Sequence, residues 1–140
     1  MSGDRFFLDT NVLVYAGDTS APAKLARARE LIRDAFDSRR GCISTQVLQE
    51  YFSVSTRKAG VTGSNARDRV VRFGHLDVVQ VTPDLVLSAI DLHLIHGLAF
   101  WDALIVKSAA AAGCRRLYSE DLQGDRVVDG VRIVNPFEGL

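Results

Sequence analysis

The chain has 140 residues, with 17 Lys and Arg against 17 Asp and Glu, so its formal net charge at pH 7 is zero. This length fits one domain with its own core, and 47% hydrophobic with 24% charged residues is the composition of a globular protein, not a disordered one. The balanced charge excludes whole-molecule attraction as an argument for nucleic-acid binding, which would have to rest on a local basic cluster.

Cysteine content and hydropathy further limit the class of protein to which the chain can belong. Cys42 and Cys114 are too few for a disulfide framework or a zinc pattern, so we expect two small buried residues in a reducing compartment. A signal peptide is not predicted, because no basic segment precedes an apolar one at the start of the sequence. The longest apolar run, residues 98–112, holds Asp102 and Lys107 and is too short for a membrane span. We expect a cytoplasmic protein with no membrane partner.

Short apolar runs predict strands, and apolar residues spaced by 3.6 positions predict helices. In chain order, the first half predicts a strand over 6–8, a polar break at 9–11 before the apolar run 12–15, a helix over 19–37, a strand over 41–44, and helices over 46–59 and 65–73. Thr19 or Ser20 is expected to cap the helix 19–37, with Pro22 in its first turn. Thr45 is expected to cap the next helix, which Gly60 ends.

The second half continues the alternation of strands and helices. In chain order it predicts a strand over 78–81, helices over 83–97 and 100–112, and strands over 116–119 and 132–134. Thr82 as N-cap and Pro83 at the first position mark the start of the first helix, and Gly97 and Gly113 end the two helices. Residues 103–106 are apolar all round, which is typical of a central buried helix.

Strands that alternate with helices are typical of the α/β class, with a mainly parallel sheet covered on both faces and right-handed crossovers. The predicted sheet has about five strands. Repeats, linkers and low-complexity segments are not apparent in the sequence. We therefore expect residues 1–140 to form a single domain.

Four acids stand where apolar or small residues would be expected: Asp9 after the first strand, Glu50 at the margin of an apolar helix face, Asp102 in the first turn of a helix, and Asp121 after the fourth strand. If the first and fourth strands are neighbours, Asp9 and Asp121 converge at the carboxyl edge of the sheet, where ligands bind in such folds. Ionised carboxylates share a pocket only when a cation offsets their repulsion. An all-carboxylate site suits Mg²⁺ or Mn²⁺.

Each acid also has a structural explanation. Asp9 or Asn11 would cap the next helix, Asp102 would be favoured by a helix dipole, and Asp121 would be a turn residue. Those explanations require a separate reason for each acid, whereas one site accounts for all four. Ordinary structural roles are expected for the three histidines, His75, His93 and His96.

The segments FLDTNVLVYA, QVLQEYF, FWDALIV, LYSEDLQ and VRIVNPF, in this order and spacing, resemble a PIN-domain protein, and most closely the VapC-type toxins of bacterial type II toxin–antitoxin pairs. The resemblance spans nearly the whole chain. It implies a three-layer α/β/α sandwich and a metal-dependent endoribonuclease. The metal-binding and catalytic acids carried over by matching motif are Asp9, Glu50, Asp102 and Asp121. Asn11 and Ser119 match supporting positions, which orient ligands or a water.

The resemblance also implies the reaction. Mg²⁺, with Mn²⁺ as the alternative, would lower the pKa of a bound water, which attacks an RNA phosphodiester in line. Whether one or two ions take part is left open. Gly124 and Asp125 stand where relatives often have His-Gly, and Ala99 stands where they often have Ser. These departures bear on substrate preference more than on the reaction.

RNA contacts are expected from the basic residues around the connection between two successive helices, because phosphate contacts position a substrate. These residues are Arg57, Lys58, Arg67, Arg69 and Arg72. A solvated helix face is the alternative for each of them. The same region is expected to receive a cognate antitoxin protein, and the resemblance implies a homodimer.

The expected role is a toxin that blocks translation by cutting tRNA, rRNA or mRNA. A PIN nuclease of RNA processing and a non-catalytic acidic metal- or RNA-binding module are the alternatives. Two other classes with an acidic Mg²⁺ site fit the sequence poorly. A haloacid-dehalogenase-type phosphatase needs a second acid in D-x-D, and Asn11 occupies that position. A receiver-type signalling domain needs an acid at the end of a middle strand, and the strand 78–81 has none there.

Overall fold

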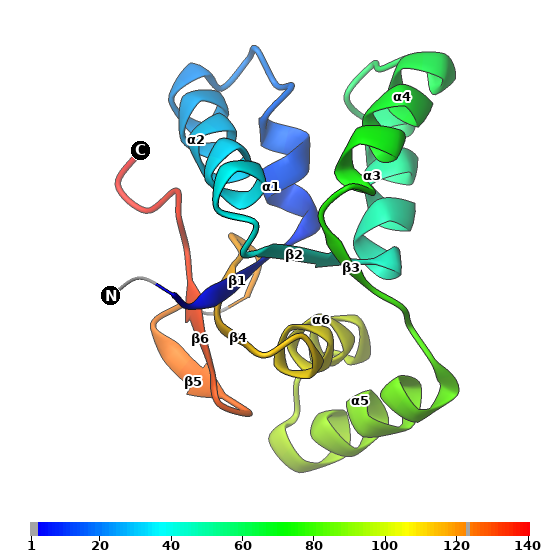
Figure 1. The fold of residues 1–140 in the computed structure, drawn as a ribbon, viewed down its shortest axis with the longest axis vertical. Coiled ribbons are helices and arrows are strands. Elements are labelled where there is room, and N and C mark those ends of the chain that lie inside the picture. The colour runs from blue at the N-terminus through cyan, green and yellow to red at the C-terminus, as the bar shows by residue number, and fades with distance from the viewer. Residues whose placement is uncertain (1–2, 123) are drawn as a thin grey trace.

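The computed structural model describes residues 3–122 and 124–140. Twelve elements follow one another within these residues (Figure 1). They are β1 (Arg5–Leu8), α1 (Thr10–Tyr15), α2 (Pro22–Ser38), β2 (Gly41–Ser44), α3 (Thr45–Arg57), α4 (Gly63–Phe73), β3 (Asp77–Val79), α5 (Pro83–His96), α6 (Phe100–Ala111), β4 (Cys114–Tyr118), β5 (Arg126–Val128) and β6 (Val131–Val134).

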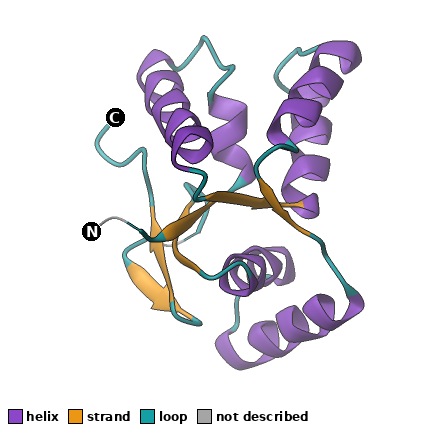
Figure 2. Cartoon of the chain, in the orientation of Figure 1, coloured by secondary structure: helices purple, strands orange, loops and turns teal. Residues whose placement is uncertain are grey.

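The described strands form one sheet in the order β3-β2-β1-β4-β6-β5. The pairs β3–β2, β2–β1, β1–β4 and β4–β6 are parallel, and β5–β6 is antiparallel. Helices α1 to α4 lie on one side of the sheet, and α5 and α6 lie on the other (Figure 2). The predicted α/β class, with a mainly parallel sheet between two helical layers, is confirmed.

Six strands lie within the described residues, where the sequence pattern predicted about five. The missed strand is β5, which pairs with β6 through a tight turn at Asp129 and Gly130, both with positive φ (53° and 79°). An Asp-Gly pair between two apolar runs is a strong hairpin signal, because such turns need positive φ at both central residues. The residues VVDGVRIV carry that signal, so β5 could have been predicted.

Helix starts differ from prediction at two places. Ala21 occupies the N-cap position of α2, and its side chain makes no capping bond within the described chain. Ser20 instead donates its hydroxyl to Asp18. Ser44, not Thr45, caps α3 by accepting from the Val47 amide at 3.3 Å. The Thr45 hydroxyl accepts from the Val81 amide at 3.2 Å and so ties α3 to the chain after β3.

Other predicted boundaries agree within a few residues. Thr82 caps α5 by accepting from the Leu85 amide, with Pro83 in the first turn, and Gly97 ends the helix in the left-handed conformation. Strands β4 and β3 begin and end slightly earlier than the sequence pattern indicated, at 114–118 and 77–79. The shift leaves Ser119 just beyond β4 instead of inside it.

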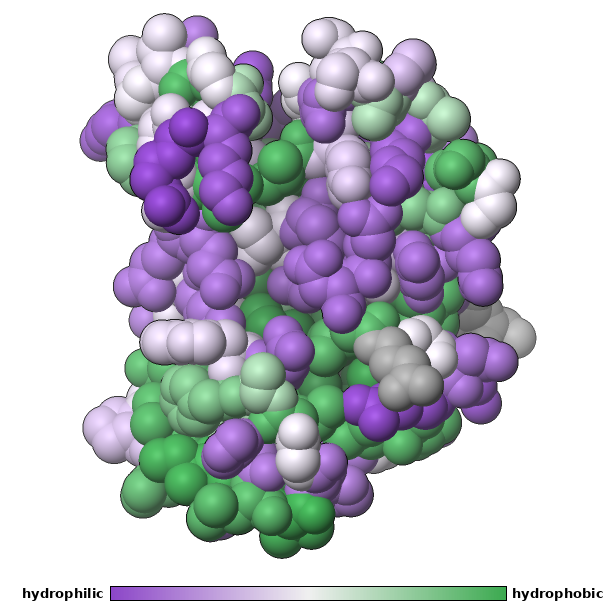
Figure 3. All heavy atoms as spheres, turned by 180° about the vertical axis from the view of Figure 1, so that it is seen from behind, coloured by the Kyte–Doolittle hydropathy of each residue, from purple (hydrophilic) through white to green (hydrophobic). Residues whose placement is uncertain are grey.

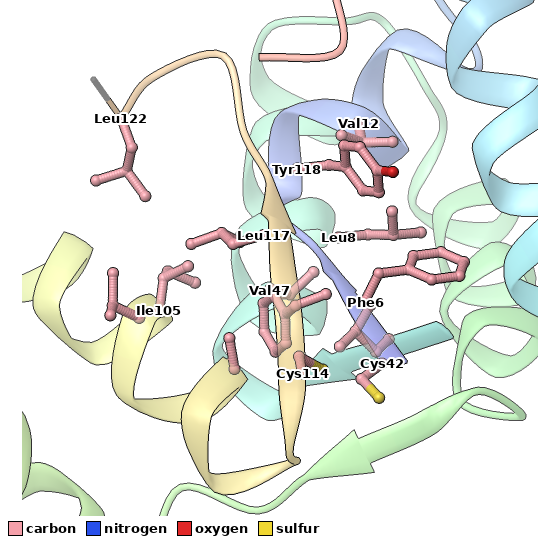
Figure 4. Packing of buried hydrophobic residues seen from close by; sticks show 14 of the residues in the cluster. Phe6, Leu8, Val12, Cys42, Val47, Ile105, Cys114, Leu117, Tyr118 and Leu122 are labelled. Atoms are coloured by element: carbon pink, nitrogen blue, oxygen red, sulfur yellow. The ribbon is translucent and has the colours of Figure 1, made fainter. Parts of the chain in front are cut away.

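Strand β1 is the centre of the core. Phe6, Phe7 and Leu8 are all buried, so both faces of this strand are covered. Figure 4 shows Phe6 and Leu8 on one side of the sheet, and Leu117 pointing to the other side toward Ile105 of α6. The fully apolar middle of α6, residues 103–106, is buried, which confirms the prediction of a central helix.

Both cysteines are buried, and neither forms a disulfide within the described chain, as expected. They lie on β2 and β4, at the edge opposite the strand ends that carry Asp9 and Ser119. They therefore belong to the packing of the sheet.

Helix α5 contacts mainly α6, and its outer side is apolar. Leu87, Ile90, Leu94 and Ile95 are exposed there, and apolar surface gathers over this region in Figure 3. Among the described helices, none by itself has both the length and the apolarity needed to cross a membrane. Helices α5 and α6 meet that requirement only as a pair, by length and composition, and are bent by 118° where they join.

Candidate active site

Neighbouring strands deliver two of the predicted site residues to one edge of the sheet. Strands β1 and β4 are parallel, and Leu8 pairs with Tyr118 at their carboxyl ends. The next residues are Asp9 and Ser119, and the Asp9 amide donates to the Tyr118 carbonyl at 3.0 Å. The first and fourth predicted strands are thus neighbours, which was the condition for Asp9 and Asp121 to lie at the same edge of the sheet.

Asp9 is both a helix cap and a lining residue of a cavity. It is the N-cap of α1, and its Oδ1 accepts from the Thr10 amide at 2.8 Å. Its Oδ2 accepts from the Ser119 hydroxyl at 2.7 Å. Only 7% of Asp9 is exposed. The capping and cavity explanations, alternatives in the sequence, therefore both describe this residue.

Ser119 and Asn11 connect Asp9 to the chain that carries Asp121. The buried Ser119 hydroxyl accepts from the Asp121 amide at 3.2 Å while it donates to Asp9. Asn11 donates its side-chain amide to Asp121 Oδ2 at 3.1 Å and accepts from the Glu120 amide at 3.3 Å. Both predicted supporting residues thus bond to predicted acids.

Glu50 on α3 is oriented by two residues that the sequence analysis did not single out. Thr10 donates its hydroxyl to Glu50 Oε1 at 2.8 Å. Gln46 donates to Glu50 Oε2 at 3.3 Å and to the Trp101 carbonyl at 3.2 Å. Gln46 precedes Glu50 by four positions, one helical turn, and that spacing was the available signal.

The four predicted acids line one cavity of about 660 Å³. Asp102 reaches it from the first turn of α6, Asp9 and Asp121 from the strand ends, and Glu50 from α3. The same cavity is lined by other polar and aromatic side chains, which include Thr10, Asn11, Tyr15, Gln46, Arg57, Lys58, Trp101 and Glu120.

The predicted RNA-contacting residues separate into groups. Arg57 and Lys58 line the cavity that holds the acids. Arg69 and Arg72 line a second groove of about 430 Å³ between α2 and α4, and Arg67 is exposed on α4 and lines neither. The floor of the second groove is apolar and its rim also carries Arg29 and Arg33.

Carboxylates outnumber the basic side chains Arg57 and Lys58 around the acid cavity. Burial raises the pKa of Asp9 to about 6, although the bonds from Ser119 and Thr10 lower it, and the charges of Glu50 and Asp121 raise it further. Burial also raises the pKa of Asp102, with added contributions from Asp121 and Glu50. Among the ion pairs formed within residues 3–122 and 124–140, none involves these four acids.

The donor chemistry of this set fits a hard divalent cation. All four side chains offer carboxylate oxygens, which Mg²⁺ and Mn²⁺ prefer, and none of the four forms an ion pair with a Lys or Arg among the described residues. Within the described part of the chain, no three His, Cys, Asp or Glu side chains are already close enough together to hold a metal ion. Ionised carboxylates that share a pocket repel one another, which opposes their closer approach.

Comparison with known proteins supports the fold and gives the family. Residues 6–129 match the family model of the PIN domain. The structure is similar to the sarcin–ricin-loop-cleaving toxin VapC20 of Mycobacterium tuberculosis, with a TM-score of 0.67, 22% identity, and 83% of this chain and 89% of that chain covered.

Two further solved structures share the fold. A toxin–antitoxin complex from Klebsiella pneumoniae has a TM-score of 0.67 and 15% identity, covering 94% of this chain and 98% of that chain. VapBC2 from Rickettsia felis, bound to a DNA fragment from its promoter, has a TM-score of 0.63 and 18% identity, with 91% and 96% covered. A search of the curated proteins found no significant match. The match over residues 6–129 shows that the chain belongs to the PIN domain family.

Proposed function

We propose that this protein is a Mg²⁺- or Mn²⁺-dependent endoribonuclease that hydrolyses RNA phosphodiester bonds. One observation carries the proposal: four carboxylates, from four separate places in the fold, line one cavity at the carboxyl edge of the sheet. Burying the ionised Asp9 carboxylate costs free energy, mainly through lost solvation and to a smaller extent through the charges of Glu50 and Asp121, and the raised pKa of Asp9 reports that cost. Strongly perturbed acids in a cavity are typical of functional sites.

The residues proposed to hold the metal are Asp9, Glu50, Asp102 and Asp121. Bound there, the ion would activate a water and stabilise charge on the scissile phosphate. The chain itself supplies orientation: Ser119 fixes one oxygen of Asp9, Thr10 fixes one oxygen of Glu50, and Asn11 holds Asp121. Such partners of metal ligands tune affinity and activity.

RNA binding is proposed for the basic and aromatic residues at the rim of the cavity. Arg57 and Lys58 stand at the end of α3, where they would contact phosphates without reading sequence. Trp101 lines the cavity with 63% of its surface exposed. An exposed aromatic ring is a surface on which a base stacks. Arg67, Arg69 and Arg72 would extend the phosphate contacts over α4.

We also propose that the nuclease is the toxin of a toxin–antitoxin pair and blocks translation by cutting tRNA, rRNA or mRNA. The PIN-domain match and the similarity to a toxin named for cleaving the sarcin–ricin loop support this role. The alternatives are a PIN nuclease of RNA processing and a non-catalytic metal- or RNA-binding module. The first would cleave RNA without arresting growth, and the second would not cleave RNA.

A cognate antitoxin is the proposed protein partner. The groove between α2 and α4 has an apolar floor that includes Leu13, Ile32 and Phe73, and its rim is basic. An acidic segment with apolar side chains would complement both features. One of the similar structures is described as a toxin–antitoxin complex, which supports a protein partner of this kind.

A homodimer in the cytoplasm is the proposed state of the free protein. The exposed apolar side chains of α5, among them Leu87 and Leu94, offer a surface that a second copy would cover. Size-exclusion chromatography with light scattering tests this state, and a monomer at micromolar concentration would contradict it.

The nuclease proposal is tested with purified protein, a mixed RNA substrate and Mg²⁺. We expect cleavage that EDTA stops and added Mg²⁺ or Mn²⁺ restores, and no cleavage by folded Asp9→Asn. Cleavage by Asp9→Asn at the wild-type rate would contradict the assignment.

The toxin role is tested separately. Expression in the native host should arrest growth, and sequencing of RNA 5′ ends after induction identifies the target.

A further inference from the structure

Glu120 also lines the acid cavity, beside Asp121, and is held by a separate set of contacts. Tyr15 donates its hydroxyl to Glu120 Oε1 at 2.7 Å. Lys24 donates to Glu120 Oε2 at 2.6 Å and to the Tyr15 hydroxyl at 3.2 Å. These three side chains form a closed triangle, which we call the Glu120 clamp.

The Glu120 clamp joins three parts of the fold. Tyr15 is the last residue of α1, Lys24 lies in the first turns of α2, and Glu120 follows β4. The Lys24 ammonium also lies 4.8 Å from the centre of the Tyr15 ring, and that ring packs edge-on against the buried Phe137 at 4.9 Å. Contacts therefore hold both the hydroxyl and the ring of Tyr15 in place.

The segment that the clamp holds is also the segment that carries Asp121. The Glu120 amide donates to Asn11 Oδ1, while Asn11 Nδ2 donates to Asp121 Oδ2. Residues 120 and 121 are therefore held on one side by Asn11 and on the other by Lys24 and Tyr15. If Glu120 were released, its charge would be free to turn toward the four acids, and Asp121 would lose one of its restraints.

We propose that Lys24 and Tyr15 act as positioning residues for the metal site: they neutralise Glu120, keep it out of the metal-binding set, and fix the place of Asp121. This inference rests on the proposed function. Lys24 does not line the cavity, so its effect would pass through Glu120. Partners of this kind typically change metal affinity or activity by about 10- to 100-fold when removed.

A purely structural role would give a different result. The Lys24–Glu120 pair is partly exposed, with 29% and 26% of the two side chains accessible, and exposed ion pairs contribute little to stability. Lys107 offers a matched control, since it pairs with Asp129 at 2.9 Å with 24% of its side chain accessible, and it lies outside the cavity. Removing either lysine should change the free energy of unfolding by a similar small amount.

The test measures Mn²⁺ binding by calorimetry in the absence of RNA. We expect Lys24→Met to weaken Mn²⁺ binding by roughly tenfold, Lys24→Arg to restore most of it, and Lys107→Met to bind like the wild type. In a Glu120→Gln background, adding Lys24→Met should have little further effect. Affinity of Lys24→Met within twofold of the wild type would overturn the proposal, as would an equal loss with and without Glu120→Gln.

RNA kinetics separate the clamp from direct substrate binding. At saturating Mn²⁺ we expect Lys24→Met to lower kcat and leave KM unchanged, whereas a raised KM with wild-type kcat would show that Lys24 contacts RNA and would overturn the proposal.

If Lys24→Met fails to fold, Tyr15→Phe is a second variant that removes only the hydroxyl. Unaltered Mn²⁺ affinity of Tyr15→Phe would count against the clamp. Wild-type protein that binds Mn²⁺ but cleaves no RNA would contradict the proposed nuclease and leave the clamp result standing.

Discussion

The Ser119 hydroxyl donates a 2.7 Å hydrogen bond to Oδ2 of Asp9, and Oγ of Ser119 also accepts from the Asp121 amide. One fully buried hydroxyl thus links the two acids that follow neighbouring strands. It fixes the orientation of the Asp9 carboxylate and, through the backbone, the position of Asp121.

Replacing Ser119 with Ala should therefore lower RNA cleavage by about 10- to 100-fold, because the orientation of a proposed metal ligand is lost. Ser119→Thr keeps the hydroxyl and should retain most activity. Ser108→Ala is a matched control, since Ser108 is equally buried but bonds to the Leu104 carbonyl of its own helix. Comparable activity losses in Ser119→Ala and Ser108→Ala would mean that the Ser119 effect is only on folding.

Asp9→Asn should abolish cleavage and also stabilise the metal-free protein. The pKa of Asp9 is raised from 3.8 to about 6 in the fold, which corresponds to roughly 3 kcal/mol against the ionised form. Part of this gain is offset because Asn has a single acceptor oxygen and cannot accept from both the Thr10 amide and the Ser119 hydroxyl. We therefore expect about 1–2 kcal/mol at pH 7.5. Urea denaturation in EDTA measures the difference.

The pH dependence of that difference has a definite sign. Because the folded pKa of Asp9 lies above the unfolded value, the folded state binds the proton more tightly, and stability falls as pH rises from about 4 to about 6. The difference in the free energy of unfolding between Asp9→Asn and the wild type should be small at pH 4 and reach its full size above pH 6. Saturating Mg²⁺ should stabilise the wild type and not the variant, and an equal gap at pH 4 and pH 7.5 would refute this account.

Strand order predicted which acids lie at one edge of the sheet, because a parallel sheet places the ends of its strands together there. Asp9 and Asp121 illustrate this, since both simply follow neighbouring strands. The partners that orient them were harder to predict. Thr10 and Gln46 bond to Glu50 from α1 and from one turn earlier on α3, and which hydroxyl or amide reaches which carboxylate depends on how these helices pack.

Local competition between hydrogen-bond partners explains the misassigned caps. Ser44 and Thr45 are adjacent and chemically similar, and either could cap α3 from sequence alone. In the structure Thr45 bonds to Val81, a contact 36 residues away, which leaves Ser44 as the cap. Strand β5 is a different case, because its turn is encoded locally by the adjacent residues Asp129 and Gly130, both with positive φ.

Charge removal at the rim should weaken RNA binding without altering the chemical step. We expect Arg57→Ala combined with Lys58→Ala to raise KM by about tenfold at low salt and to reduce the salt dependence of binding, because fewer counterions are released from the phosphates. The pair Arg69→Ala and Arg72→Ala should have a smaller effect, since those residues line the other groove. Fluorescence anisotropy of labelled RNA across a salt series measures both. A larger loss from the α4 pair would place the RNA along that groove instead.

Trp101 is the single tryptophan of the chain, so its fluorescence reports directly on the rim of the cavity. We expect RNA to quench this fluorescence in the Asp9→Asn variant, which should bind without cutting. Trp101→Ala should raise KM by roughly tenfold, consistent with about 1–3 kcal/mol for stacking one base. Trp101→Phe should recover part of that loss.

The kcat of Trp101→Ala should change little, because Gln46 bonds to the backbone carbonyl of residue 101, which the substitution leaves in place. Phe52→Ala is the matched control, since Phe52 is also an exposed aromatic residue but lies outside the cavity. If RNA leaves the fluorescence unaltered, or if Trp101→Ala and Phe52→Ala have equal effects on KM, then Trp101 does not contact the substrate. A fluorescence change that depends on protein concentration without RNA would instead place Trp101 in an interface between two copies of the chain.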